Sequence, residues 1–295
     1  MASVKLEKLS TVSGPAGMES LVKDVNQLVS LPDVYYRLES AIADPSSSTD
    51  RIARLLQSDA DLCARLLRIA NSAFYSFPTA IDSIDRAVTT LGLRQIRELI
   101  LVTAVVKAFS GIPERIVNMS RFWEHSIAVG ILSRNLAQHL RLPQADSIYI
   151  PGLLHDIGHL AMYLKLPELM HDLLLQTTHQ GKDLHQLEYD CLGYTHAEIG
   201  GQLLENWNLP ASIYQPVREH HDPLHGSDFE RNSCVVNIAD AWVNANRIDS
   251  RGEPSSLTPN ENIMSMLEID AQELDEIGVL AGEQGRAVLL NFTAH

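Results

Sequence analysis

Apolar residues recur along this chain mainly at three- and four-residue intervals, which places them on one face of a helix. In the first third of the chain this spacing predicts helices over Glu19–Leu31, Asp33–Ala43, Ile52–Leu56, Leu62–Ala70, Ile81–Leu91 and Leu93–Phe109. Gly92 is expected to end the fifth of these helices, and Gly111 with Pro113 the sixth. No segment alternates apolar and polar residues over a strand's length, so the pattern predicts an all-α fold.

The same spacing continues through the rest of the chain. It predicts helices over Arg121–His139, Ser147–Leu164, Pro167–Thr178, Leu184–Cys191, Thr195–Trp207, Pro210–Glu219 and Arg231–Ala245, and two weaker ones over Pro259–Leu267 and Gln272–Leu290. Thr195 and Glu198 have the spacing of a capping box, in which each side chain accepts a hydrogen bond from the other residue's backbone. His196 is therefore expected in the first turn of its helix.

The positions of the predicted helices and loops divide the chain into four parts. Residues 1–18 are expected to form a loose leader, residues 19–113 an N-terminal helical subdomain, residues 114–250 a helical core and residues 251–295 a C-terminal helical extension. Residues 19–295 are expected to form one compact unit. A length of 295 residues is compatible with one large domain or two modest ones.

Composition narrows the classes of protein that remain. No apolar run reaches the roughly 18 residues of a membrane span, and the first 30 residues lack the pattern of a secretory signal. The three cysteines are widely separated, which favours reduced thiols and a cytoplasmic location. A net charge of −14 disfavours general binding of nucleic acid, because neutralising phosphate supplies much of that affinity.

The histidines are confined to one part of the chain. None of the 12 precedes His125, and 11 fall between His125 and His225. Imidazole and carboxylate together suit borderline divalent metals, and the candidate ligands are His125, His155, Asp156, His196, His220, His221 and Asp240. The adjacent His155 and Asp156 would let the imidazole bind one ion while the carboxylate bridges to a second, as in two-metal phosphoesterases. The surface is the expected place for His139, His171, His179, His185, His225 and His295.

Each of these residues also has a purely structural interpretation when it is taken alone. A His-Asp dipeptide is common, His125 could be an ordinary helix histidine, and Asp240 could be a helix cap or an ion-pair residue. The order of all seven along successive predicted helices is what favours a metal site.

That order resembles the HD superfamily of metal-dependent phosphohydrolases. Leu153–Gly158 is similar to its namesake motif, while His196–Leu204, Trp207–Pro210 and the His220-His221 pair are similar to the HDOD subfamily. In the N-terminal half, Asp59–Ala73 is similar to the helical region that precedes the HDOD core. The resemblance covers roughly residues 20–245.

The resemblance implies an all-helical fold in which an N-terminal bundle packs on an HD-type core. By analogy with the related HD-GYP phosphodiesterases, a first metal would be held by His125, His155, Asp156 and Asp240. Asp156 would bridge to a second metal, held by His196, His220 and His221. Iron or manganese is expected, and zinc, nickel and cobalt use similar ligands.

Three departures from the HD-GYP pattern are visible. His159 stands where those enzymes have a phosphate-binding lysine, and Arg121 stands where many have a further glutamate ligand. The Gly-Tyr-Pro motif is absent after His221. These departures count against hydrolysis of cyclic di-GMP, although metal binding does not depend on these positions.

Three functions follow from these observations. The first is a bacterial signalling adaptor with protein partners, in which the metal site is structural or sensory. The second is a phosphohydrolase acting on a nucleotide, a cyclic dinucleotide or another phosphoester, with Asp156 holding both metals and His159 or Arg218 steadying the phosphate. The third is nucleic-acid binding through four arginines of the N-terminal helices, which the net charge opposes: Arg51, Arg54, Arg65 and Arg68.

Overall fold

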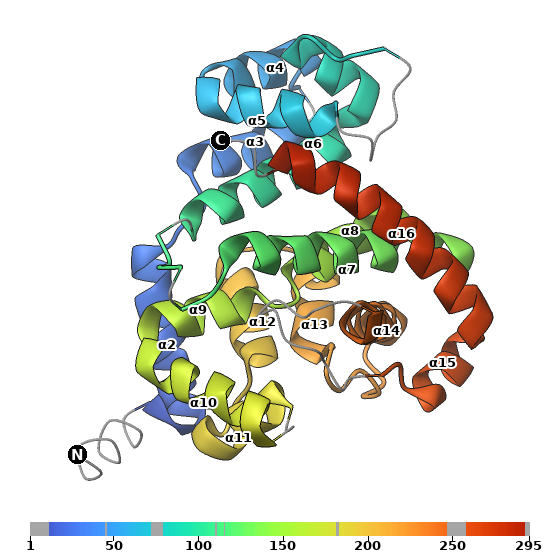
Figure 1. Ribbon diagram of the computed structural model, residues 1–295. Helices are drawn as coiled ribbons and strands as arrows, with labels where there is room; N and C mark the ends of the chain where they lie inside the picture. The colour runs from blue at the N-terminus through green and yellow to red at the C-terminus, as the bar shows by residue number, and fades with distance from the viewer. Residues whose placement is uncertain are drawn as a thin grey trace. The chain divides into compact units, whose positions relative to one another are not determined.

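The computed structural model describes the backbone of residues 12–44, 46–71, 79–109, 111–114, 116–180, 183–246 and 258–292. Within these ranges every regular element is a helix and no strand is present, which confirms the all-α prediction (Figure 1). None of the described helices is long and apolar enough to cross a membrane. The described residues fall into two compact units.

The smaller unit contains the described residues of Val29–Gly111 and of Glu283–His295. Its helices are α3 (Asp33–Ala43), α4 (Thr49–Gln57), α5 (Ala60–Ala70) and α6 (Ile84–Ala108). The α6 backbone leaves helical geometry at Gly92, where φ is 79° and ψ is 161°. Glycine adopts this positive φ at little cost, so the break predicted at Gly92 is present as a kink between two helical segments. Leu38, Leu56, Leu66 and Ile96, one from each helix, are fully buried in this unit.

The larger unit contains the described residues of Met1–Leu28 and of Ile112–Gly282. Its helices are α2 (Gly14–Leu28), α7 (Met119–His139), α8 (Tyr149–Leu154), α9 (Ile157–Lys165), α10 (Pro167–Gln180), α11 (Leu184–Leu192), α12 (His196–Asn206), α13 (Ala211–Glu219), α14 (Glu230–Asn246), α15 (Glu261–Leu267) and the start of α16 (Ala271–Phe292). A 3₁₀ turn, η1 (Ala145–Ile148), precedes α8. The first helix begins at Gly14 and not at Glu19, so part of the predicted leader is helical.

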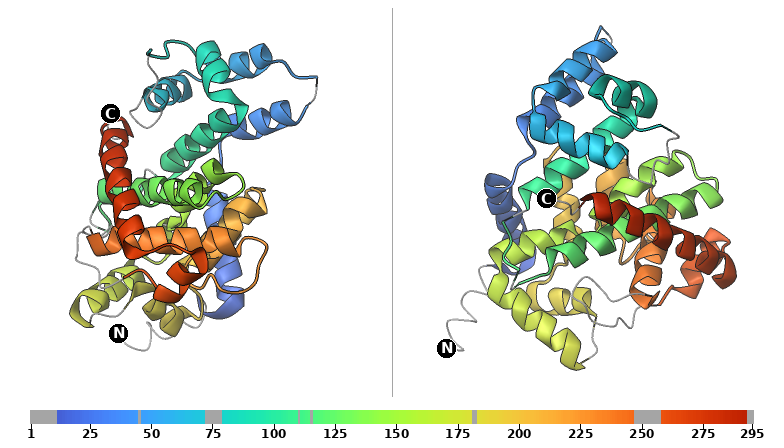
Figure 2. Two further views of the ribbon diagram at one scale, coloured as in Figure 1. Left: turned by 90° about the vertical axis from the view of Figure 1, so that its right-hand side faces the viewer. Right: turned by 45° about the horizontal axis from the view of Figure 1, so that its top comes forward.

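Helix α7 is the central element of the larger unit and is buried on most sides. It packs against α8 and α14, while α12 packs against α9 and α13. The start of α16 lies beside α14 (Figure 2). There Trp242 Nε1 donates to Asp275 Oδ1 at 2.7 Å. The centre of this unit is therefore enclosed by helices from distant parts of the sequence.

Candidate metal centre

The helix predicted over residues 147–164 is broken at the His155-Asp156 dipeptide. Helix α8 ends at Leu154 and α9 begins at Ile157, and between them Asp156 has φ −92° and ψ 8°, outside helical geometry. On a continuous helix the two neighbouring side chains would point about 100° apart. The break lets both reach one buried cluster, with His155 Nε2 lying 3.5 Å from Asp156 Oδ2.

One group of donors joins α7, the end of α8 and α14. His125 Nε2 lies 3.1 Å from Asp240 Oδ1 and 3.3 Å from His155 Nε2, and His155 Nε2 lies 3.4 Å from the same Asp240 oxygen. All three side chains are buried. Two imidazole nitrogens and a carboxylate oxygen within contact distance of one another form a metal-binding donor set.

Asp156 lies between this group and a second one. Its Oδ2 atom faces His125 Nε2 at 3.9 Å and His155 Nε2 at 3.5 Å. Its Oδ1 atom faces His196 Nε2 at 3.2 Å and His159 Nδ1 at 3.3 Å. A carboxylate shared by two metal ions needs this disposition, with one oxygen turned to each side.

The second group is built by α12 and the end of α13. His196, His220 and His221 bring one nitrogen each to within 4.8 Å of the others, and His221 Nε2 lies 3.0 Å from His196 Nε2. His220 also belongs to a group with His155 and Asp156. The structure therefore brings all seven predicted ligands into overlapping donor groups, and it adds His159 to them.

Contacts outside the cluster orient three of the imidazoles. His155 Nδ1 donates to the carbonyl oxygen of Gly152 at 2.8 Å, and His220 Nδ1 donates to that of Val217 at 2.7 Å. His196 Nδ1 donates to Glu188 Oε2 at 2.7 Å. Each ring thereby turns Nε2, the nitrogen that a metal would bind, toward the cluster, which is the arrangement of metal-ligating histidines.

His220 provides a direct test of whether a metal fits. Its Nε2 atom is fully buried and has no hydrogen-bond partner in the described part of the chain, while its Nδ1 proton is already donated. A buried polar atom without a partner costs about 1–3 kcal/mol. A metal ion ligated by this nitrogen would remove that cost, so the residues present fit a metal.

Sequence reasoning missed Glu188, which is completely buried beside the cluster. Its Oε1 atom accepts from His159 Nε2 at 2.9 Å, and its Oε2 atom accepts from both the backbone and the ring of His196. The sequence contained one indication of this residue, because Glu188 follows Leu184 and Leu187 at the spacing of the apolar face of α11. An acidic residue on such a face needs a buried partner.

His185 corrects an expectation about the surface. It is half-buried, and its ring stacks on that of His221 with 4.2 Å between centroids and 14° between planes. Burial lowers the pKa of His185, and His196 lowers it further. His185 thus supports the outer side of a candidate ligand, whereas His139, His171 and His225 are at the surface or partly exposed.

The two residues predicted to steady a phosphate have other partners. Arg218 Nη2 donates to Glu205 Oε2 at 2.6 Å, and its guanidinium lies 5.3 Å from the ring centroid of Tyr214. His159 lies between Asp156 and Glu188 and contacts one with each ring nitrogen. A phosphate role for either residue stays a prediction.

Protons partly balance the charge of the buried carboxylates. Burial lowers the pKa of His155 and of His159, but Asp156 and further carboxylates outweigh that effect and raise them to about 9 and about 10. Burial likewise opposes ionisation of Asp156 and Asp240, yet the adjacent histidines hold both carboxyl pKa values well below the usual range. His220 differs, because burial and the charge of His155 lower its pKa to about 3.

Comparison with known proteins shows which family model and which curated relative this chain matches. A family model described as the HDOD domain matches residues 28–223, a range that ends before Asp240. An uncharacterized protein of Treponema pallidum (strain Nichols) is 26% identical over 246 residues, which are 83% of this chain and 46% of that protein. The chain therefore spans about half the length of this curated relative.

Solved structures share the fold. An HDOD domain protein of unknown function from Geobacter sulfurreducens is 25% identical, with a TM-score of 0.75 over 93% of this chain and 98% of that one. A candidate phosphohydrolase from Shewanella amazonensis SB2B is 25% identical, with a TM-score of 0.73 over 92% and 98% of the two chains. A candidate signal transduction protein from Marinobacter aquaeolei VT8 is 21% identical and shows the fold alone, with a TM-score of 0.73 over 94% and 65%.

Proposed function

The chain belongs to the HDOD domain family, and from that premise we propose that it is a bacterial signal-transduction protein that retains a complete site for two divalent transition-metal ions. The first ion would be held by His125, His155, Asp156 and Asp240. The second would be held by His196, His220 and His221, with Asp156 shared between the two. Iron and manganese suit this donor set best, and zinc, nickel and cobalt are compatible with it.

The position of Asp156 carries this proposal. Its two oxygens are divided between the two donor groups, with Oδ2 at 3.5 Å from His155 Nε2 and Oδ1 at 3.2 Å from His196 Nε2. The Nε2 atoms of His155, His196 and His220 already face inward, because each ring donates its Nδ1 proton outward. A site organised in this way needs little rearrangement to accept metal.

Two observations favour a sensory or structural role over catalysis. The guanidinium of Arg218 is engaged by Glu205, and His159 is engaged by carboxylates on both ring nitrogens. His159 has no ring nitrogen left for a phosphoryl group, and Arg218 could bind one only with the donors that Glu205 leaves.

A phosphohydrolase is the second candidate, and the complete ligand set supports it. Two bound ions would supply a Lewis-acid pair that activates water and orients a phosphoester. Asp156 would keep the donor groups together, and His159, which touches Asp156 Oδ1 at 3.3 Å, would hold a proton beside the site. The substrate would be a nucleotide, a cyclic dinucleotide or another phosphoester.

Metal content per chain tests the shared part of both proposals. The protein is purified without oxygen or chelator and analysed by mass spectrometry beside Asp156→Ala and His225→Ala. His225 is exposed and pairs with Asp222, so it serves as the matched control. We expect about two ions in the wild type and in His225→Ala, and none in Asp156→Ala. No metal in the wild type after soaking with iron or manganese would contradict the proposal.

The same proteins separate the two functions. Hydrolysis of bis(p-nitrophenyl) phosphate by the loaded wild type, lost in Asp156→Ala and kept in His225→Ala, would favour the phosphohydrolase. Two bound ions without turnover of this diester or of nucleotides would favour the signalling role.

A further inference from the structure

The smaller unit contains an open pocket between α3 and α4 that has no part in the metal centre. Its volume is about 670 Å³, within the range of roughly 300–1,000 Å³ that small-molecule sites occupy. The lining residues are Asp33, Tyr36, Arg37, Ser40, Ala41, Arg51, Arg54, Leu55 and Ser58. Three arginines line the pocket with one carboxylate, and a second carboxylate, Asp44, pairs with Arg51, which leaves the pocket with a net positive charge.

The charge of the surrounding segment sets it apart from the rest of the chain. Residues 29–111 contain nine lysines and arginines and nine aspartates and glutamates, so this segment is neutral. The chain's net charge of −14 therefore comes entirely from the other residues. An anion meets less repulsion over this unit than the total charge would indicate.

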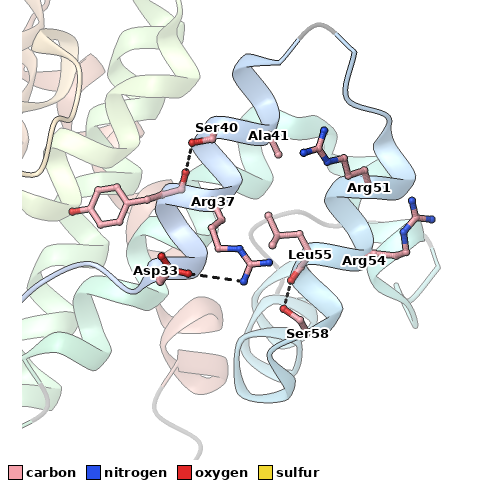
Figure 3. Close-up of a pocket in the computed structure, with 9 residues that line it drawn as sticks. Asp33, Arg37, Ser40, Ala41, Arg51, Arg54, Leu55 and Ser58 are labelled. Atoms are coloured by element: carbon pink, nitrogen blue, oxygen red, sulfur yellow. Dashed lines mark hydrogen bonds and ion pairs between the residues drawn. The ribbon is translucent and has the colours of Figure 1, made fainter.

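The arginine side chains are arranged to receive an anion. Arg37 extends from α3 and Arg51 from α4 into the space between the two helices, and Arg54 lies at the outer edge of α4 (Figure 3). Asp44 holds Arg51 by accepting from Nη1 at 3.0 Å, while Arg37 lies 3.9 Å from Asp33 in an exposed pair. Such exposed pairs are weak, and a guanidinium has five N–H donors, so donors remain for bidentate binding of phosphate.

The other polar groups of the pocket favour a ligand that also has hydrogen-bond donors. Ser40 Oγ donates to the Tyr36 carbonyl at 2.9 Å, and Ser58 Oγ donates to the Leu55 carbonyl at 2.6 Å. With their protons engaged, both hydroxyl oxygens can act only as acceptors. Asp33 is a further acceptor at the edge, where it would repel a ligand made of phosphate alone.

We infer that this pocket binds a phosphorylated small molecule that carries hydroxyl or amino groups, the chemistry of a nucleoside phosphate. The arginines bind the phosphate, and the serine oxygens and Asp33 accept from the sugar or the base. A small ligand fits better than duplex nucleic acid, because the chain's net charge of −14 opposes binding of an extended polyanion.

Titration calorimetry of the full-length protein tests this inference, with ADP as the probe. Arg37→Gln and Arg51→Gln should each weaken ADP binding by about tenfold or more, since hydrogen bonds to charged groups contribute about 1.5–3 kcal/mol. Arg86→Gln is the matched control, because Arg86 is an exposed arginine of the same unit that pairs with Asp82. Circular dichroism verifies that each variant is folded.

Two further comparisons locate the binding and identify the ligand class. Asp156→Ala should bind ADP as the wild type does, because the metal centre lies elsewhere. Pyrophosphate, which has no hydroxyl or amino donors, should bind more weakly than ADP, and Asp33→Asn should reduce that difference. The inference fails if ADP does not bind at millimolar concentration, if only Asp156→Ala loses binding, or if the arginine variants lose affinity for duplex DNA and not for ADP.

Discussion

Glu188 and His196 are joined twice through a single carboxylate oxygen. Oε2 of Glu188 accepts from the backbone nitrogen of His196 at 2.9 Å and from its ring Nδ1 at 2.7 Å. The other oxygen accepts from His159 Nε2 at 2.9 Å. One buried carboxylate on α11 therefore orients two imidazoles of the candidate metal centre and holds the first turn of α12.

Replacing Glu188 by glutamine should weaken metal binding by about 10–100-fold, the usual effect of losing a partner that orients a ligand. An amide keeps the shape of the side chain but has only one acceptor oxygen. One of the two imidazoles would then face an N–H group and lose its orientation. Titration of the apo protein with Mn²⁺ measures the affinity.

Glu273→Gln is the control for that experiment, because Glu273 is partly exposed, contacts the surface residue His139 and the Asp270 backbone, and belongs to none of the donor groups. An affinity in Glu188→Gln equal to that of the control would show that the carboxylate has no role in orienting the ligands.

Asp240→Ala should remove one ion and retain the other. Asp240 contacts His125 and His155, which belong to the first donor group, whereas the group of His196, His220 and His221 does not include it. Elemental analysis should therefore find about one ion per chain, against none in Asp156→Ala, if Asp156 is the shared ligand. Loss of both metal ions in each of the two variants would mean that the two donor groups do not bind metal independently.

Metal binding should release protons at neutral pH. The pKa values of His155 and His159 are raised to about 9 and about 10, so both side chains are imidazolium ions, protonated on both ring nitrogens, in the metal-free protein at pH 7.5. A metal needs the lone pair of His155 Nε2 and must displace its proton. Apparent affinity should accordingly rise with pH until about pH 9. Calorimetry in two buffers of different ionisation enthalpy measures the released protons, and identical heats in both would contradict the expectation.

Gly158→Ala should destabilise the larger unit by about 3 kcal/mol, at the upper end of overpacking effects. A β-carbon at this position would collide with the backbone carbonyl of His196 and approach the backbone nitrogen of Gly200. Helices α9 and α12 would have to separate, and the distance between Asp156 and His196 would increase. Urea denaturation measures the change in the free energy of unfolding, with bound metal as a second readout.

Gly111→Ala is the matched control for that substitution. Gly111 is exposed, and a β-carbon there would meet no atom within 4 Å. Its effect should stay within about 0.5 kcal/mol. A similarly small change in the free energy of unfolding of Gly158→Ala would show that helices α9 and α12 can separate without loss of stability.

Local features of the sequence were sufficient to predict the helices and the positions of several helix ends. The capping box at Thr195 and Glu198 depends on residues three positions apart, and both of its hydrogen bonds are present. The break at Gly92 depends on one residue with an unusual freedom of φ. Such features could be read from the chain because the interacting groups are neighbours in sequence.

The choice of candidate ligands came from the order of histidines and aspartates and from the family pattern. Seven residues on five stretches of chain were selected in this way, and the structure brings them together in overlapping groups. The sequence could not show that the helix breaks at Asp156, because the residues around the break have the apolar spacing of a continuous helix.

Only the tertiary structure decided how these ligands are supported. Glu188 meets His159 from 29 residues away, and His185 stacks on His221 from across the fold. Gly158 is required because two helix backbones approach closely at that point. These relationships depend on which groups lose water together when distant helices pack, and periodicity along a single helix contains no information about its partners.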